Sequence, residues 1–332
     1  MIEPRNKTLL FTAYQRLLLR VNPAYPKRAE IEKDLENLKI GFKGEYRIDQ
    51  AIKETHFTDA FYVLPNVELK VSPHRRIEID TLILTERFIC IFEVKNLKGT
   101  LKFNENPYSL HQTINGKTYS YPCPQQQTLR AADSLHYWLR QQFKINLPIQ
   151  IAIVLPNPNV LIETAPTKVK LLSPREIPLF LQGLDTHSKI VSGNHLKQIV
   201  STIKRENSPF NIFPLAEKYN IPINHLRTGI VCPCGGNGIR TTQRTWICTR
   251  CKETIKKAIE NTLFDWFLLY KSSISHKECS NLLQIQNRNT VTKILKNMKL
   301  EATGSTRSRL YHYDYKKDLV KQEASLVNLI YV

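Results

Sequence analysis

The hydrophobic pattern of the first hundred residues predicts helices followed by strands. Residues 8–20 and 28–38 have helical periodicity, and three strand-like runs follow at 61–70, 77–84 and 88–95. Between them a further helix is predicted to run to about Glu54, because one face repeats every three or four positions: Gly41, Gly44, Glu45, Ile48 and Ile52. The last two strand-like runs are apolar on both faces, as central strands are. We therefore expect a helix followed by a three-stranded meander.

The next hundred residues extend this pattern into a layered domain. Residues 100–121 read as a polar hairpin with its turn at Asn115-Gly116, 125–142 as a helix, and 149–156 as a buried strand. A strand at 168–172 precedes a helix start, in which serine, proline and glutamate stand in capping positions: Ser173, Pro174 and Glu176. The order helix, three strands, helix, strand predicts an α/β core of about 160 residues.

The C-terminal part has a different composition. A proline-rich polar stretch reads as a connector. The helix that follows 257 carries an apolar stripe, which we expect to be core: Ile259, Leu263, Trp266, Phe267 and Tyr270. Helices at 276–283 and 288–298 and a hairpin at 299–313, with Gly304 near its tip, resemble a winged helix-turn-helix.

The patterns divide the chain into six segments. These are an N-terminal helical arm (1–38), the α/β domain (39–200), a linker (201–225), a cysteine-rich module (226–256), a winged-helix-like domain (257–318) and a tail (319–332).

Charge and cysteine usage narrow the class of protein. Lys and Arg number 48 against 29 Asp and Glu, a net charge of +19 that favours a polyanionic partner, with nucleic acid as the leading candidate and a merely basic soluble protein as the alternative. No apolar run approaches the roughly 18 residues of a membrane span, and we identify no secretion signal. Four of seven cysteines have metal-like spacing, so we expect a reducing cytoplasm.

Three charged residues lie inside the apolar strands. Glu93 and Lys95 are two apart on one strand and so share a face, and Asp80 lies on the neighbouring run. Two nearby carboxylates repel unless a cation lies between them, and an all-oxygen ligand set suits Mg²⁺. We predict a Mg²⁺ (or Mn²⁺) site at Asp80, Glu93 and the carbonyl of Val94, with Glu45 as an extra ligand, either direct or through water. A structural ion pair with Lys95 is the alternative.

The predicted site suits phosphodiester hydrolysis. A bound Mg²⁺ lowers the pKa of a water ligand and neutralises charge on phosphate, while Lys95 would orient or help deprotonate the attacking water and stabilise developing charge. A small-molecule enzyme lacks support, because we identify no G-x-G-x-x-G motif after a strand, Walker loop or Ser-His-Asp arrangement.

The motifs resemble a known family. G41-x-x-G-E45, the I79-D80 strand, E93-V-K95-N96-x-x-G99 and C123-P124-x-x-Q127 look like the NERD (nuclease-related) domain, over about residues 39–160. That family is grouped with the PD-(D/E)xK nucleases, whose restriction-endonuclease-like core has the order αβββαβ. The resemblance implies Asp80, Glu93 and Lys95 as the catalytic set and Glu45 and Gln127 as accessory residues. A helix-capping or surface glutamine is the alternative for Gln127. Cys123 stands where the family usually has asparagine.

The cysteine module has the spacing of a zinc ribbon. Cys232-x-Cys234 and Cys248-x-x-Cys251 offer four thiolates from two tight turns, which predicts a closed, structural Zn²⁺ site, with disulfides as the alternative.

Basic and polar residues of both C-terminal modules suggest nucleic-acid contacts. Those predicted to bind are Arg244, Trp246 and Arg250 of the ribbon, Arg288, Asn289 and Lys293 of the second helix, and Arg307 and Arg309 of the wing. A protein-docking role for the helix pair and hairpin is the alternative.

Together these features predict a cytoplasmic, Mg²⁺-dependent nuclease, with a DNA endonuclease as the favoured activity. A homodimer would allow such an enzyme to cut both strands. The alternative is a non-catalytic DNA-binding or regulatory protein that uses the nuclease fold as a scaffold.

Overall fold

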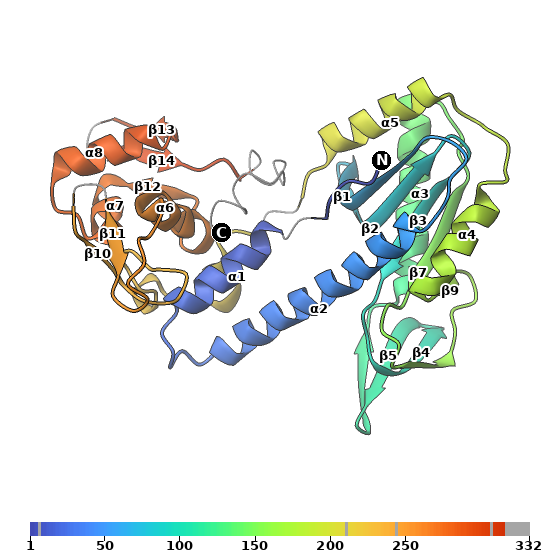
Figure 1. Cartoon of the computed structure of the whole chain (residues 1–332), viewed down its shortest axis with the longest axis horizontal. Coiled ribbons are helices and arrows are strands. Elements are labelled where there is room, and N and C mark those ends of the chain that lie inside the picture. Colours follow the sequence, from blue (N-terminus) through green and yellow to red (C-terminus); the bar gives the residue numbers. More distant parts are fainter. Residues whose placement is uncertain (6–7, 210–211, 243–244, 306–307, 316–332) are drawn as a thin grey trace. The chain divides into compact units, whose positions relative to one another are not determined.

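The computed structural model describes residues 1–5, 8–209, 212–242, 245–305 and 308–315. These form two compact units (Figure 1): unit 1 contains Met1–Arg5 and Lys39–Pro209, and unit 2 contains Asn6–Leu38 and Phe210–Val332. Arg244, Arg307 and the tail 319–332, each of which carries a sequence-based prediction, lie outside the described residues.

A five-stranded sheet forms the centre of unit 1. Its order is β1 (Phe61–Ser72), β2 (Arg75–Thr85), β3 (Ile89–Val94), β7 (Ile149–Val154) and β9 (Lys170–Leu172). The first three strands are an antiparallel meander, as predicted, and β7 and β9 continue it in parallel. β3 is buried along its whole length, which accounts for its apolar residues on both faces.

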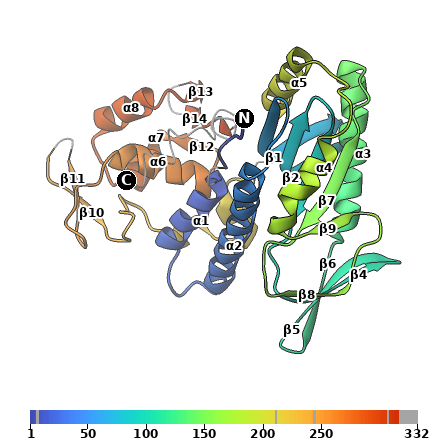
Figure 2. The same ribbon diagram turned by 45° about the vertical axis from the view of Figure 1, so that its right-hand side comes forward.

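Helices cover both faces of this sheet (Figures 1 and 2). α3 (Pro124–Phe143) and α5 (Gly193–Glu206) pack on one face, and α2 (Arg28–Lys53) and α4 (Ile177–Leu184) on the other. The order α2, β1, β2, β3, α3, β7 is the predicted αβββαβ order. The predicted capping box is present at Ser173 and Glu176, in a short 3₁₀ turn before α4.

α2 is one continuous helix, so the expected break between 28–38 and the following helix was wrong. Each interior glycine costs a helix about 1 kcal/mol relative to alanine, so Gly41 and Gly44 weaken the middle of α2. Burial of Ile31 and Leu35 in the core of unit 2, and of Ile48 in that of unit 1, offsets this cost.

A second sheet in unit 1 has the order β6-β5-β4-β8, formed by Lys117–Tyr121, Tyr108–Ile114, Gly99–Glu105 and Val160–Thr164. The predicted turn at Asn115-Gly116 connects β5 to β6. Residues 99–121 hold three strands instead of the two of a simple hairpin, because the chain also turns at Asn106-Pro107.

Unit 2 is built around α1 (Leu9–Arg20) and α6 (Ala258–Leu269), whose apolar faces share one core. It also contains β10 (Gly238–Arg240), β11 (Trp246–Cys248), β12 (Ser273–Ser275), α7 (His276–Leu283), α8 (Arg288–Asn297), β13 (Glu301–Thr303) and β14 (Leu310–His312). The last three strands make an antiparallel sheet of order β12-β14-β13. The helices and hairpin lie where the sequence placed them, while β12 was not foreseen.

The predicted N-terminal arm and the predicted linker are not separate segments but packed parts of the two units. α1, from the predicted arm, packs in the core of unit 2 through Tyr14 and Leu17. The predicted linker begins inside α5 and then contributes Leu215 and Tyr219, both fully buried, to the same core. Its prolines prevent long regular elements, but they do not stop apolar side chains from packing. None of the described helices is long and apolar enough to cross a membrane.

Candidate active site and metal centre

Asp80 and Glu93 meet where β2 and β3 run side by side. Thr81 is paired with Phe92, so Asp80 and Glu93 occupy the next position on the two strands. Instead of a ladder bond, the Oδ2 atom of Asp80 accepts a hydrogen bond of 2.7 Å from the backbone N–H of Val94. The carboxylate of Asp80 is therefore held between Glu93 and Lys95 along the neighbouring strand.

Glu93 and Lys95 point to the same side, as their spacing predicted. The Nζ atom of Lys95 lies 2.5 Å from Oε1 of Glu93, and Glu93 is only 2% exposed. The ion pair that was the alternative to a metal site is thus present in the described structure. Within the described part of the chain, the carboxylate of Asp80 forms no salt bridge of its own and is held by the N–H of Val94.

Two carboxyl groups and one ammonium group leave this cluster with an excess of negative charge when both acids are ionised. Burial, and then the charge of Asp80, raise the pKa of Glu93 to about 8, and burial also raises the pKa of Asp80. Burial alone would lower the pKa of Lys95, but Glu93 and Asp80 raise it, which keeps Lys95 cationic. A divalent cation between the two carboxyl groups would compensate the excess, so these residues fit a Mg²⁺ or Mn²⁺ ion.

Glu45 lies beside this cluster but has a partner of its own. Its Oε2 atom is 2.7 Å from Nη1 of Arg5, a residue that sequence analysis did not connect with the site. Burial raises the pKa of Glu45 to about 7, Arg5 opposes the rise, and Asp80 adds to it. Asp80 therefore acts electrostatically on both Glu45 and Glu93.

Glu78 is a further acidic residue that sequence analysis did not assign. It stands two positions before Asp80 on β2, and its charge acts on both Glu93 and Lys95. Although Glu78 is exposed, partial loss of hydration raises its own pKa, and the neighbouring carboxylates of Glu68 and Asp80 add to the rise. The spacing of Glu78 and Asp80 along one strand was a signal that could have identified it.

Gln127 is exposed, and in the described structure its side chain forms no hydrogen bond with the acidic residues. It lines a groove of about 420 Å³ together with Glu78 and Arg130, at the start of α3. The neighbouring Gln125 is the buried glutamine of this turn. Its amide donates to Glu105 over 2.8 Å, and its carbonyl accepts from the backbone of Lys168 over 2.8 Å. These bonds give Gln125 a structural role.

α2 approaches the end of β3 closely at Gly44. A Cβ atom there would lie 2.6 Å from Cβ of Asn96 and 3.0 Å from Cγ of Pro156. The Nδ2 atom of Asn96 also donates 2.7 Å to the carbonyl of Ile40. Gly44 and Asn96 thus fix the helix that carries Glu45 against the strand that carries Glu93 and Lys95.

This part of the chain corresponds to a known family. Residues 40–156, about a third of the chain, match the family described as "NERD: Nuclease-related domain". Residues 40–156 are a nuclease-related domain. The match contains Glu45, Asp80, Glu93, Lys95 and Gln127, and it coincides with the segment whose motifs resembled the NERD family.

Two further comparisons add little to the NERD assignment. The small subunit (R.BspD6I2) of the heterodimeric restriction endonuclease R.BspD6I is 15% identical over 52% of this chain and 85% of that chain, with a TM-score of 0.20. A TM-score this low does not establish a shared fold. The comparison with curated proteins found no match.

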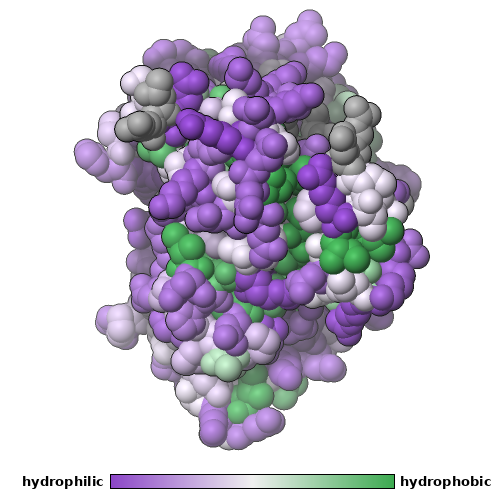
Figure 3. All heavy atoms as spheres, turned by 90° about the vertical axis from the view of Figure 1, so that its left-hand side faces the viewer, coloured by the Kyte–Doolittle hydropathy of each residue, from purple (hydrophilic) through white to green (hydrophobic). Residues whose placement is uncertain are grey.

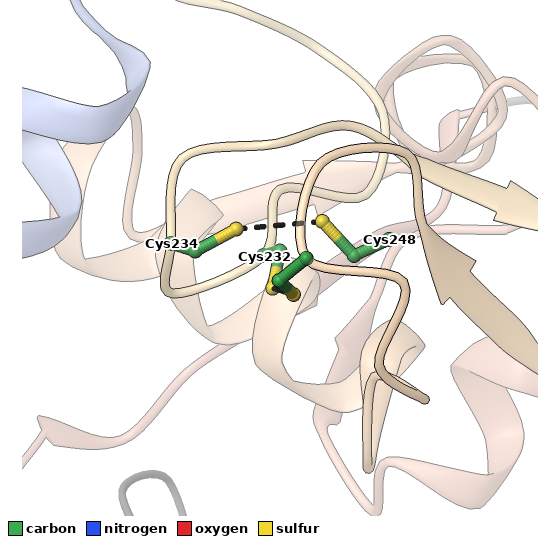
Figure 4. A group of neighbouring side chains, drawn as sticks. Cys232, Cys234 and Cys248 are labelled. Atoms are coloured by element: carbon green, nitrogen blue, oxygen red, sulfur yellow. Dashed lines mark hydrogen bonds between the residues drawn. The ribbon is translucent and has the colours of Figure 1, made fainter.

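Outside the NERD domain, four cysteines gather in unit 2. Cys232, Cys234, Cys248 and Cys251 place their sulfur atoms within 4.8 Å of one another, and all seven cysteines of the chain are free. Figure 4 labels three of the four, Cys232, Cys234 and Cys248. The two sulfur atoms are 3.8 Å apart in the pair Cys232 and Cys251 and 3.4 Å apart in the pair Cys234 and Cys248. Four sulfurs about 2.3 Å from a tetrahedral Zn²⁺ lie about 3.8 Å apart, so the cluster fits zinc.

The backbone at Cys248 favours a thiolate, whereas burial raises the pKa of Cys232 to about 12. Burial would raise the pKa of Cys248, but N–H groups of Cys251 and Arg250 lower it to about 6, and Arg250 donates to its sulfur over 3.3 Å. Gly236 is required for close packing, since a Cβ there would lie 2.5 Å from Sγ of Cys248. The site has no place for a reacting ligand, which indicates a structural centre.

The residues predicted to bind nucleic acid fall into two groups. Arg288, Asn289 and Lys293 on α8, and Arg309 beside β14, are exposed. Trp246 is partly buried against the core of unit 2, and Arg250 donates 2.9 Å to the carbonyl of Cys234, so both have structural contacts as well. On the face drawn in Figure 3, hydrophilic side chains predominate and apolar ones form separate areas.

Proposed function

We propose that the protein is a metal-dependent nuclease that hydrolyses phosphodiester bonds of nucleic acid, with DNA as the favoured substrate. The observation that carries the proposal is the pair Asp80 and Glu93 inside a NERD domain, two adjacent carboxyl groups whose pKa values are both raised. A purely structural ion pair with Lys95 needs only one carboxylate, whereas a divalent cation explains both.

Asp80, Glu93 and the carbonyl of Val94 would hold Mg²⁺ or Mn²⁺. When bound, the ion supplies charge neutralisation at the phosphate and lowers the pKa of a coordinated water. Glu45 bonds to Arg5, so it is better placed to support the site through water than as a direct ligand.

Lys95 would act as a cation. Its raised pKa supports a role in donating hydrogen bonds to the attacking water and to a phosphate oxygen, where it stabilises the developing charge, rather than a role as general base. In the reaction the water oxygen bonds to phosphorus, the ester P–O bond breaks, and the leaving oxygen takes up a proton.

Unit 2 would bring DNA to this site. The order α6, β12, α7, α8, β13, β14 with the sheet β12-β14-β13 resembles that of a winged helix and supports this proposal. In such a fold α8 would be the recognition helix and would offer Arg288, Asn289 and Lys293 to DNA. The four-cysteine cluster would hold a structural Zn²⁺ beside it. The cytoplasm is the compartment that suits four reduced thiolates.

Cleavage of labelled single-stranded DNA, double-stranded DNA and RNA tests the proposal. We expect cutting in Mg²⁺ or Mn²⁺, no cutting in EDTA, and no cutting by Asp80→Asn purified in the same way, which controls for a contaminating nuclease. Equal cutting by wild type and Asp80→Asn, or none by either while both bind DNA, would overturn it.

A further inference from the structure

The first residues of the chain dock on the edge of the central sheet of unit 1. Val63 of β1 donates 3.0 Å to the carbonyl of Met1, and Glu3 donates 3.0 Å to the carbonyl of Val63. Ile2 forms a parallel bridge with Val63. The segment therefore extends the sheet beyond β1, and the residues that follow carry Arg5 toward the acidic cluster.

Arg5 is among the most extensively bonded side chains of unit 1. Its side chain is fully buried, and it donates two hydrogen bonds, of 2.8 and 3.1 Å, to the carboxylate of Asp49. It also donates 2.7 Å to Glu45 and 2.9 Å to the side chain of Asn66. A buried cation is stable only when it is paired and hydrogen-bonded in this way.

The remaining bonds of Arg5 fall on the backbone that carries Asp80. Its Nη2 atom donates 3.0 Å to the carbonyl of Asp80 and 2.7 Å to Oγ1 of Thr81. Asp80 lies opposite Asn66 of β1, which has a positive φ of 51°. The regular pairing of β1 with β2 is interrupted at these two residues and is present on either side of them. Arg5 thus donates a hydrogen bond to the main chain of Asp80, a residue that β1 does not pair with.

These bonds lead to the proposed metal ligands. Asp80 is bonded at its carbonyl to Arg5 and at its carboxylate to the N–H of Val94, between Glu93 and Lys95. Glu45, from α2, is bonded to the same guanidinium. One planar group therefore ties α2, β1 and β2 together beneath the site, which the flexible ammonium of lysine cannot do.

We propose that Arg5 is a positioning residue of the active site, which fixes the main chain at Asp80 and Thr81 so that the Asp80 carboxylate meets Val94 and Glu93. Its effect on catalysis rests on the proposed nuclease function. Its effect on the position of Asp80 does not, because the N–H of Val94 reports that position directly.

Arg5→Lys tests this with two measurements. We expect kcat for cleavage to fall by at least about tenfold while KM changes less than about threefold, because a misplaced ligand impairs the chemical step more than substrate binding. We also expect hydrogen exchange of the Val94 amide to be at least about tenfold faster, which corresponds to about 1.4 kcal/mol. Thr81→Val, which removes one acceptor of Arg5 at nearly constant volume, should change both in the same direction if Arg5→Lys folds poorly.

Arg20→Lys is the matched control. Arg20 is also fully buried and bonded to a buried carboxylate, Asp265 at 2.7 Å, but it belongs to unit 2. This variant should lose stability yet keep the kcat and Val94 exchange of wild type. Faster Val94 exchange in Arg5→Lys, with no cutting even by wild type, would uphold the positioning role and overturn the nuclease function. Unchanged kcat and unchanged exchange in Arg5→Lys and Thr81→Val would overturn the inference.

Discussion

The raised pKa of Glu93 makes the stability of the fold depend on pH. Its folded-state pKa of about 8 lies above the 4.5 of an unperturbed glutamate, because the charged form is buried and faces Asp80. The folded protein therefore holds this proton more tightly than the unfolded chain. The resulting stability is fully present below about pH 4.5 and is lost as pH rises through about 8.

We predict that Glu93→Gln removes this dependence. In buffer without Mg²⁺ or Mn²⁺, the free energy of unfolding of wild type should fall between pH 5 and 9 by an amount on the order of a few kcal/mol, since one pKa unit corresponds to about 1.4 kcal/mol. Glu93→Gln should be flatter over this range and more stable than wild type at pH 9, as chemical denaturation would show. Glu163→Gln, at an exposed position of β8, should follow wild type. An equal slope for wild type and Glu93→Gln would contradict the raised pKa.

Some residues of the candidate site can be identified from the sequence, whereas others become apparent only in the fold. Asp80, Glu93 and Lys95 were identifiable because charges are costly inside apolar strands. Arg5 lies in a short polar segment with no periodicity, and its contacts span 40 to 76 residues along the chain. Only the fold brings it to Glu45 and Asp80.

At the scale of elements, the packing of α2 on the end of β3 is a constraint on the site. We predict that Gly44→Ala destabilises unit 1 by about 1–3 kcal/mol, because the new methyl group overlaps Asn96 and Pro156. Cleavage should fall too, since α2 carries Glu45. Thermal unfolding and cleavage rates measure the two effects.

Gly41→Ala is the matched control on the same helix. Its Cβ would meet nothing within 4 Å, so helix propensity should make it neutral or stabilising by up to about 1 kcal/mol. If Gly44→Ala behaved like Gly41→Ala, the close approach of α2 to Asn96 would be wrong.

The four-cysteine cluster is predicted to hold a Zn²⁺ ion that stabilises unit 2. Wild type should contain one Zn²⁺ per chain, and Cys248→Ser should lose it and destabilise unit 2, because a closed thiolate site contributes folding energy. Zinc released to a colorimetric chelator and thermal unfolding measure this. Cys123→Ala, which removes a buried cysteine of unit 1 outside the cluster, should retain the metal. A full zinc content in Cys248→Ser would exclude the proposed ligand set.

Local pattern also decided which elements were predictable. α7 and α8 have clear caps, Ser275 and Asn287, each of which accepts a bond from the third residue of its helix, and both were placed correctly. β12 has three residues and is a strand only because β14 pairs with it, so no local signal identifies it. The same holds for Leu215 and Tyr219, whose burial depends on α1 and α6.

At the scale of the whole molecule, the charge of +19 predicts salt-dependent binding of DNA. The double variant Arg288→Ala and Lys293→Ala should bind DNA more weakly, and the slope of log K against log salt should become shallower by up to about 0.9 for each phosphate that is no longer neutralised. Fluorescence anisotropy at several salt concentrations measures both quantities. Lys197→Ala, at an exposed position of α5, should retain the wild-type slope. An unchanged slope in the double variant would exclude α8 from the interface.

The chain-level organisation was only partly visible in the sequence. The αβββαβ order was identifiable because each element has its own periodicity, whereas the NERD segment was identifiable because its motifs resemble those of the family. The division into two units was not, because residues 6–38 precede the NERD domain in the chain but belong to unit 2. Tyr14 and Leu17 are apolar positions of an ordinary amphipathic helix, and nothing in that pattern names the surface against which they pack.

Single-turnover cleavage by wild type, Glu93→Ala and Lys95→Ala, with DNA binding measured on the same preparations, would decide whether the acidic cluster is catalytic. We predict Mg²⁺-dependent cutting by wild type and a loss of at least about a hundredfold in both variants, while DNA binding is retained. If the folded, zinc-loaded wild type cut nothing and all three proteins bound DNA equally, the acidic cluster would not be catalytic. The NERD domain would then be a binding scaffold.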